Sequence, residues 1–214
     1  MVKYSYQDYP AAFRRYNTQY PDAEIVGWTL YDTQTYTSGS TVSLTFFNAV
    51  RATIDLSNME TAGQLAPPKA FLCRAISVYF KIRPESTIQP SAPNPQTGAL
   101  NNVIQLANNG VLQLQVGNKI YAEYPVWALC SGGGPYGVLA VVDIGSGSPI
   151  VSGEVDFATL GSPDTRDVLT LPKPLFIAPG INFQATITWP AALTLTRNTD
   201  IQVALDGEMI RPVQ

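Results

Sequence analysis

Two groups of residues have types and spacings that could support chemistry. The segment Ser131-Gly132-Gly133-Gly134-Pro135 could hold an anion with its backbone N–H groups, as phosphate-binding loops do. Glu154 and Asp156 stand two residues apart in a strand-like segment, so both side chains would point to the same face. Paired carboxylates of this kind serve glycoside hydrolases and calcium sites.

A simpler interpretation is favoured for both groups. No Lys-Ser or Lys-Thr follows the glycine run, so an ordinary surface loop explains it. A solvent-facing strand explains Glu154 and Asp156 by alternation alone. Asp164, Arg166 and Asp167, which share a turn containing Ser-Pro, are explained by local turn hydrogen bonding. The sequence therefore predicts no catalytic residues.

Histidine is absent from the whole chain. This excludes histidine general bases, Ser-His-Asp and Cys-His nucleophiles, and most zinc, copper and non-haem iron sites. The two cysteines, Cys73 and Cys130, match no paired metal-ligand spacing, and we predict two buried free thiols. We therefore expect neither a metal nor a cofactor.

The composition favours a protein that associates with other proteins. Of 214 residues, 45% are hydrophobic and only 14% are charged, which leaves little surface charge to hold copies apart. The net charge of -3 provides no field to draw the chain onto nucleic acid, so we expect no sequence-specific nucleic-acid partner. No signal-peptide pattern and no run of membrane-spanning length is present, so we expect neither secretion by that route nor insertion in a bilayer.

Aromatic residues recur in the first 22 residues, which we interpret as an N-terminal arm. Tyr6, Tyr9, Phe13, Tyr16 and Tyr20 are spaced three, four, three and four apart, which places them on one face of a helix. We predict that these five residues form a contact surface for another subunit. The alternative, that the arm folds back on its own barrel, is equally compatible with the spacing.

Residues 23–214 are predicted to form a single all-β domain, a jelly-roll sandwich or barrel with at most one or two short helices. Short β-rich segments alternate with Gly- and Pro-rich turns. The predicted elements are a hairpin of 24–31 with 41–47, a strand over 71–82, a loop over 84–98, a helix over 100–107, a hairpin of 111–116 with 119–124, and strands over 138–144, 150–160, 175–177, 181–189 and 201–205. Within the helix, Leu100, Val103, Ile104, Leu106 and Ala107 are expected to share the apolar face.

The chain resembles the jelly-roll coat proteins of tailless icosahedral bacteriophages, particularly single-barrel capsid proteins of the membrane-containing kind. The resemblance rests on the turn Asn58–Leu65, the hairpin Leu112–Tyr124 with the following Pro125 and triple glycine, and the segment Leu205–Gln214. It implies a structural virion protein that forms the capsid shell by self-association, made in the host cytoplasm. Its partners would be other copies of itself and other capsid proteins, with an internal membrane as a further contact.

Two other functions are compatible with the sequence. A carbohydrate- or receptor-binding β-sandwich, such as a phage fibre tip or lectin, would stack sugars on Trp28, Trp127 or Trp189 or on several tyrosines. A glycanase without histidine would use Glu154 and Asp156.

Overall fold

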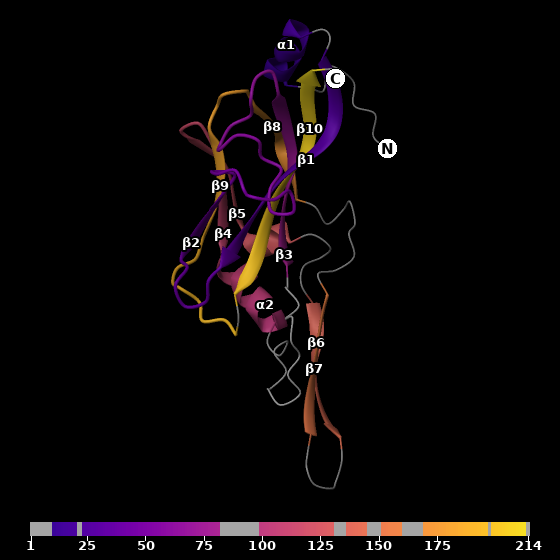
Figure 1. Ribbon diagram of the computed structural model, residues 1–214, viewed down its shortest axis with the longest axis vertical. Coiled ribbons are helices and arrows are strands. Elements are labelled where there is room, and N and C mark those ends of the chain that lie inside the picture. The colour runs from indigo at the N-terminus through magenta and orange to yellow at the C-terminus, as the bar shows by residue number, and fades with distance from the viewer. Residues whose placement is uncertain are drawn as a thin grey trace.

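The computed structural model describes residues 10–20, 23–81, 99–130, 136–144, 151–159, 169–196 and 198–212. Eight of its strands form two antiparallel four-stranded sheets, with strand orders β1-β10-β3-β8 and β2-β9-β4-β5 (Figure 1). The bounds are β1 (Ala23–Tyr36), β2 (Ser43–Phe46), β3 (Ala70–Lys81), β4 (Val111–Val116), β5 (Lys119–Pro125), β8 (Leu169–Ile177), β9 (Phe183–Thr188) and β10 (Thr199–Pro212).

The path of the chain between the two sheets defines a jelly roll. Among these eight strands, only the β4–β5 connection stays within one sheet, and every other connection crosses to the opposite sheet. Eight strands wound in this way form two sheets that share one core, which is the jelly-roll architecture. The predicted all-β fold with few helices is thus confirmed.

Alternating apolar residues fill the space between the sheets. On β3, which matches the strand predicted over 71–82, Ile76, Val78 and Phe80 point into the core, while Ser77 and Tyr79 alternate with them. The facing sheet supplies Leu112 and Leu114 from β4, Ala185 and Ile187 from β9, and Phe46 from β2. Burial of these two apolar faces against each other is the main favourable term for the fold.

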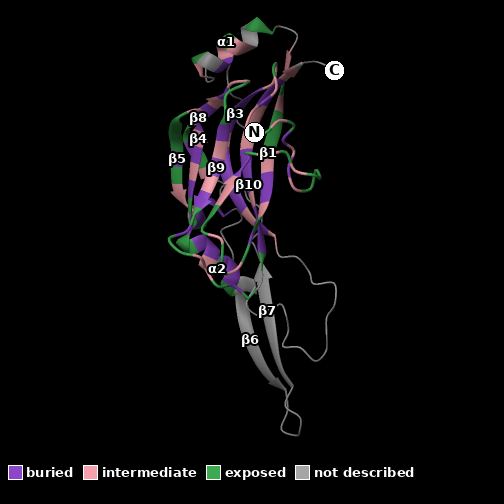
Figure 2. Ribbon diagram, turned by 60° about the vertical axis from the view of Figure 1, so that its left-hand side comes forward, coloured by how far each residue is buried: buried purple, intermediate pink, exposed green. Residues whose placement is uncertain are grey.

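The helix α2 (Ala99–Asn109) covers one end of the sandwich, and the 3-10 helix η2 (Val126–Leu129) packs beside it (Figures 1 and 2). The buried residues of α2 include Val103, Leu106 and Ala107, as the spacing predicts. Ile104 was expected on the same face but is 37% exposed, so that assignment is wrong. Ile104 lies about 100° from Val103 around the helix, at the margin of the buried stripe.

The β4–β5 hairpin follows the prediction closely. Val116 pairs with Lys119 across Gly117 and Asn118, and Gly117 has a φ of 58°. A positive φ at the first turn residue is what a type II′ turn requires, and glycine adopts it without steric cost.

The predicted hairpin of 24–31 with 41–47 is wrong. Residues 23–36 pair instead with β10 over their whole length, and Ser43–Phe46 pairs with β9 in the opposite sheet. The turn at Thr37–Thr41 therefore carries the chain from one sheet to the other. Local turn residues cannot reveal which of these outcomes occurs, because the competing partner strands come from the distant end of the chain.

A further antiparallel pair, β6 (Tyr136–Ile144) with β7 (Val151–Thr159), lies between β5 and β8 in sequence. The strands predicted over 138–144 and 150–160 correspond to it. The loop predicted over 84–98 lies outside the described residues, as does the glycine run from Ser131 to Pro135.

Candidate functional site

The helix α1 (Ala11–Gln19) forms most of the described part of the N-terminal arm and packs against its own barrel. Phe13 is fully buried in a small cluster with Ala70 and Leu72 of β3 and Ile210 of β10. Its ring meets the Phe176 ring of β8 edge to face, with centroids 5.9 Å apart. The helix therefore covers one end of the outer face of the β1-β10-β3-β8 sheet.

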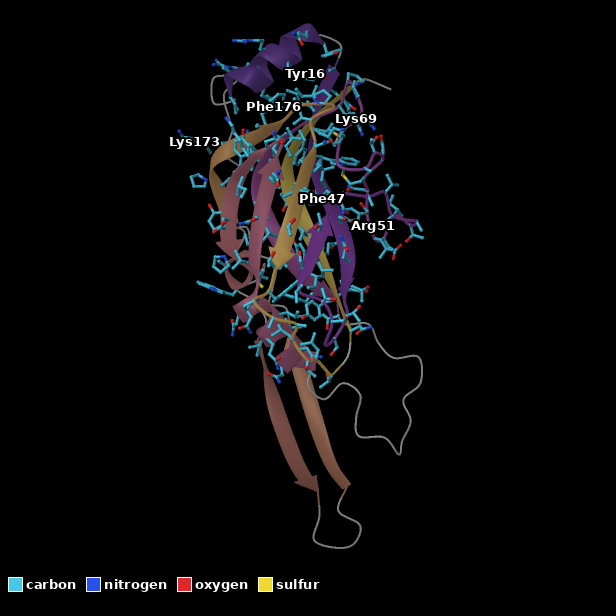
Figure 3. All side chains as sticks on the ribbon, turned by 90° about the vertical axis from the view of Figure 1, so that its left-hand side faces the viewer. Tyr16, Phe47, Arg51, Lys69, Lys173 and Phe176 are labelled. Atoms are coloured by element: carbon cyan, nitrogen blue, oxygen red, sulfur yellow. The ribbon has the colours of Figure 1, made fainter. Side chains whose placement is uncertain are left out.

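Tyr16 ties the same helix to the segment that leads into β3. Its hydroxyl donates a hydrogen bond to the Pro68 carbonyl oxygen at 2.9 Å, and its ring contacts the Tyr20 ring. The Tyr16 ring also lies near the Phe176 ring (Figure 3). Burial raises the pKa of the Tyr16 hydroxyl to about 12, and Tyr20 acts in the same direction.

The five predicted arm residues thus divide into two groups. Phe13, Tyr16 and Tyr20 lie on or beside α1, and Phe13 and Tyr16 contact the barrel of the same chain. Tyr6 and Tyr9 lie outside the described residues. Contact of the arm with another subunit stays a prediction.

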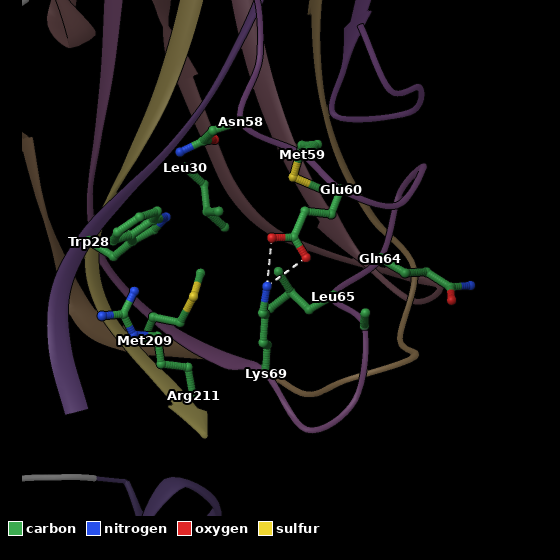
Figure 4. Close-up of a pocket in the computed structure, with 11 residues that line it drawn as sticks. Trp28, Leu30, Asn58, Met59, Glu60, Gln64, Leu65, Lys69, Met209 and Arg211 are labelled. Carbon is green, nitrogen blue, oxygen red and sulfur yellow. Dashed lines mark hydrogen bonds and ion pairs between the residues drawn. The ribbon is translucent and has the colours of Figure 1, made fainter. Parts of the chain in front are cut away.

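A cavity of about 230 Å³ opens between β1, the end of β10 and the segment that connects β2 to β3 (Figure 4). Trp28, Leu30, Met59, Leu65 and Met209 give it an apolar wall. At its rim, the Lys69 ammonium group contacts the Glu60 carboxylate at 2.5 Å, and the Arg211 guanidinium lies 5.7 Å from the centre of the Trp28 ring.

The buried carboxylate of Asp32 holds the start of the same connecting segment. It accepts a hydrogen bond from the Phe47 backbone N–H at 2.7 Å, and from Arg51 Nε at 2.9 Å and Nη2 at 3.1 Å. Phe47 has a φ of 67°, an uncommon conformation for a bulky residue that the surrounding bonds must maintain. The hydrogen bond to Asp32 raises the pKa of the Arg51 guanidinium, so Arg51 stays charged.

The β2-β9-β4-β5 sheet presents an outer face that is almost free of charge. We define this outer face by the residues that alternate with the buried ones, together with Ile120, which pairs with Gln115 beyond the β-bulge: Ser43, Thr45, Val111, Gln113, Gln115, Ile120, Tyr121, Glu123, Gln184, Thr186 and Thr188. Of these residues only Glu123 is charged, and it accepts a hydrogen bond from Gln113 Nε2 at 2.6 Å. Figure 2 shows β5, at the edge of this face, largely exposed.

No family model, curated protein or solved structure matches this chain. Neither α1 nor α2 is long and apolar enough to cross a membrane. Among the described residues, no three His, Cys, Asp or Glu side chains come together in a group that could hold a metal ion.

The side chains singled out for chemistry lie outside the described residues. Glu154 and Asp156 lie in β7, opposite Val141 and Leu139 of β6, and their side chains fall outside the described part of the chain, as do Asp164, Arg166 and Asp167.

The prediction of two buried free thiols is confirmed. Burial raises the pKa of both Cys73 and Cys130 to about 12, which leaves them as unreactive thiols at neutral pH.

The three tryptophans proposed as sugar platforms differ in exposure. Trp189 is buried, and its indole N–H donates to the Leu106 carbonyl oxygen at 3.0 Å, so it cannot stack on a ligand. Trp127 is 60% exposed and Trp28 is 38% exposed. Sequence reasoning missed Asp32 and the nearly uncharged outer face of the β2-β9-β4-β5 sheet. The alternation of Thr and Gln in 111–116 and 183–188 was a signal for the latter.

Proposed function

We propose that the chain is a structural coat subunit that builds a viral shell by self-association, as the capsid proteins of tailless icosahedral bacteriophages do. The nearly uncharged outer face of the β2-β9-β4-β5 sheet carries this proposal. The jelly-roll fold is compatible with it, because viral capsid domains use this architecture, but the fold also serves other functions.

A surface of Thr, Ser and Gln side chains suits contact between identical subunits. Burying a charged side chain without a partner is costly, whereas neutral hydroxyl and amide groups can donate to and accept from the same groups on a second copy. Val111 and Tyr121, which are 41% and 54% exposed, add apolar area to the same face.

The area of the face indicates how strong each such contact would be. Four strands about 4.8 Å apart, each about five residues long, cover roughly 300 Å². A stable isolated pair of proteins buries about 800 Å² on each partner, so one such contact would be weak. A shell in which every subunit makes several contacts would be stable through their combined effect.

A charge placed at the end of β9, an inner strand of this sheet, tests the proposal. Thr188 is exposed and lies between Ser43 and Val111 on the neighbouring strands. We expect Thr188→Lys to reduce assembly, measured by light scattering over a range of protein concentrations, at least tenfold at a given concentration. The reason is that each contact would have to bury an ammonium group without a partner.

The matched control is Thr194→Lys, which adds the same charge at an exposed position outside this face. Both variants should keep the thermal stability of the unmodified chain, because both sites are exposed. If Thr188→Lys assembles as readily as the unmodified chain, the outer face is not the contact surface and the proposal loses its support.

A further inference from the structure

A second cavity lies at the end of the sandwich where the β4–β5 turn meets the connections between β2 and β3 and between β8 and β9. Its volume is about 390 Å³, within the roughly 300–1,000 Å³ range of small-molecule sites. Five amide side chains line it: Asn48, Gln115, Asn118, Asn182 and Gln184. None of the residues lining it carries a charge.

Hydrogen bonds engage four of these amides, two through residues outside the cavity and two with each other, and leave defined groups unused. Arg51 Nη2 donates to Asn48 Oδ1 at 3.4 Å, and Gln64 Nε2 donates to Asn182 Oδ1 at 2.5 Å. Gln184 Nε2 donates to Gln115 Oε1 at 3.5 Å. The unused groups are therefore the NH₂ donors of Asn48 and Asn182 and the carbonyl acceptor of Gln184.

Asn118 adds both kinds of group, because its side chain makes no hydrogen bond to any other described residue. The cavity thus presents donors and acceptors, most of them on side chains that are hydrogen-bonded to neighbours. Gln115 Nε2 donates to the Gly117 carbonyl oxygen at 2.9 Å, and the Gly117 N–H donates to the Asn182 carbonyl oxygen at 2.7 Å. These two bonds hold the β4–β5 turn against the β8–β9 connection.

Hydrogen bonds also hold the groups behind Asn48. Asn48 follows Phe47, whose backbone is held by Asp32, and the Arg51 that contacts Asn48 is itself paired with Asp32. An ion pair between Arg51 and the buried Asp32 carboxylate thereby positions one amide of the cavity. Groups fixed in advance lose little entropy when a ligand binds, which favours affinity.

From this set of groups we infer that the cavity binds a neutral saccharide unit. A sugar hydroxyl donates and accepts at the same time, so neighbouring hydroxyls match mixed amide donors and acceptors. The absence of charge in the lining disfavours phosphate, sulfate or carboxylate ligands. A peptide is disfavoured because its side chains need apolar subsites, and the apolar lining consists of Ala62 and the buried Phe183. This inference does not depend on the coat-protein proposal.

The test is calorimetric titration of the full chain with glucose, galactose, mannose, N-acetylglucosamine and their neutral oligomers. Saccharide concentrations up to about 10 mM would nearly saturate a site with a Kd of about 1 mM. At least one neutral saccharide should bind. Asn118→Ala and Asn48→Ala should each weaken that binding about fivefold to tenfold, since each removes about one hydrogen bond.

Asn108→Ala, which removes an exposed amide from α2, is the matched control and should leave the affinity unchanged. Three results would overturn the inference. They are no binding of any neutral saccharide, binding only of a sulfated saccharide used for comparison, and binding that survives Asn48→Ala and Asn118→Ala but is lost in Trp127→Ala. The Thr188→Lys variant is designed not to assemble. Saccharide binding by this variant would show that the saccharide site does not require assembly.

Discussion

The Tyr16 hydroxyl links the N-terminal helix to the chain ahead of β3, and its protonation state should control that link. The raised pKa of about 12 means that the phenol stays neutral in the folded protein while it ionises near pH 10 in the unfolded chain. The stabilising contribution is fully present below about pH 10 and is lost as the pH rises toward 12.

Denaturant unfolding of the unmodified chain and of Tyr16→Phe at a series of pH values checks this expectation. The unmodified chain should lose stability relative to the variant across the window from about pH 10 to pH 12, because phenylalanine cannot ionise. A difference in stability that stays constant through this window would contradict the assignment.

At the scale of single residues, the sequence predicts those features that are determined by residues close by in the chain. Gly117 and Asn118 identify a turn because the required φ is a property of the turn itself. Asp32 gives no such signal, since a carboxylate in a strand is ordinarily a surface residue. Its partners, Phe47 and Arg51, meet it only after the chain has crossed to the other sheet.

The helix α1 illustrates the scale of whole elements. Its nine residues are too few to be stable alone, so packing on the barrel must provide its stability. Phe13 is the residue that provides most of that contact, because it is fully buried against β3, β8 and β10.

Replacing Phe13 with Ala should therefore lower the free energy of unfolding by about 3 kcal/mol, as loss of a buried aromatic side chain typically does. Gln19→Ala, an exposed change in the same helix, should alter it by less than about 0.5 kcal/mol. Thermal or denaturant unfolding of the two variants measures the difference. Equal stability of the two variants would mean that α1 does not hold to its own barrel in solution, and that the arm is available to a neighbour.

Elements with local partners were predictable, and elements with distant partners were not. The β4–β5 hairpin and α2 match the sequence-based expectation because their signals lie within a few residues. The pairing of β1 with β10 joins residues at opposite ends of the chain, so the predicted hairpin with 41–47 was a reasonable but wrong local choice.

At the scale of the whole molecule, the low content of charged residues and the jelly-roll topology are both compatible with the proposed self-association. The 14% of charged residues indicated an associating protein, and the structure places few of them on the outer face of the β2-β9-β4-β5 sheet. The amide-lined cavity was not predictable, because Asn48, Gln115 and Asn182 come from three separate connections or strands. Only the crossing pattern of the sheets brings them together.

Electron microscopy of the concentrated, purified chain tests the central claim of self-association most directly. We expect curved or closed assemblies of regular size that appear above a threshold concentration, since many weak contacts must form together. A chain that stays monomeric at every concentration, with no regular particles in the images, would contradict the account.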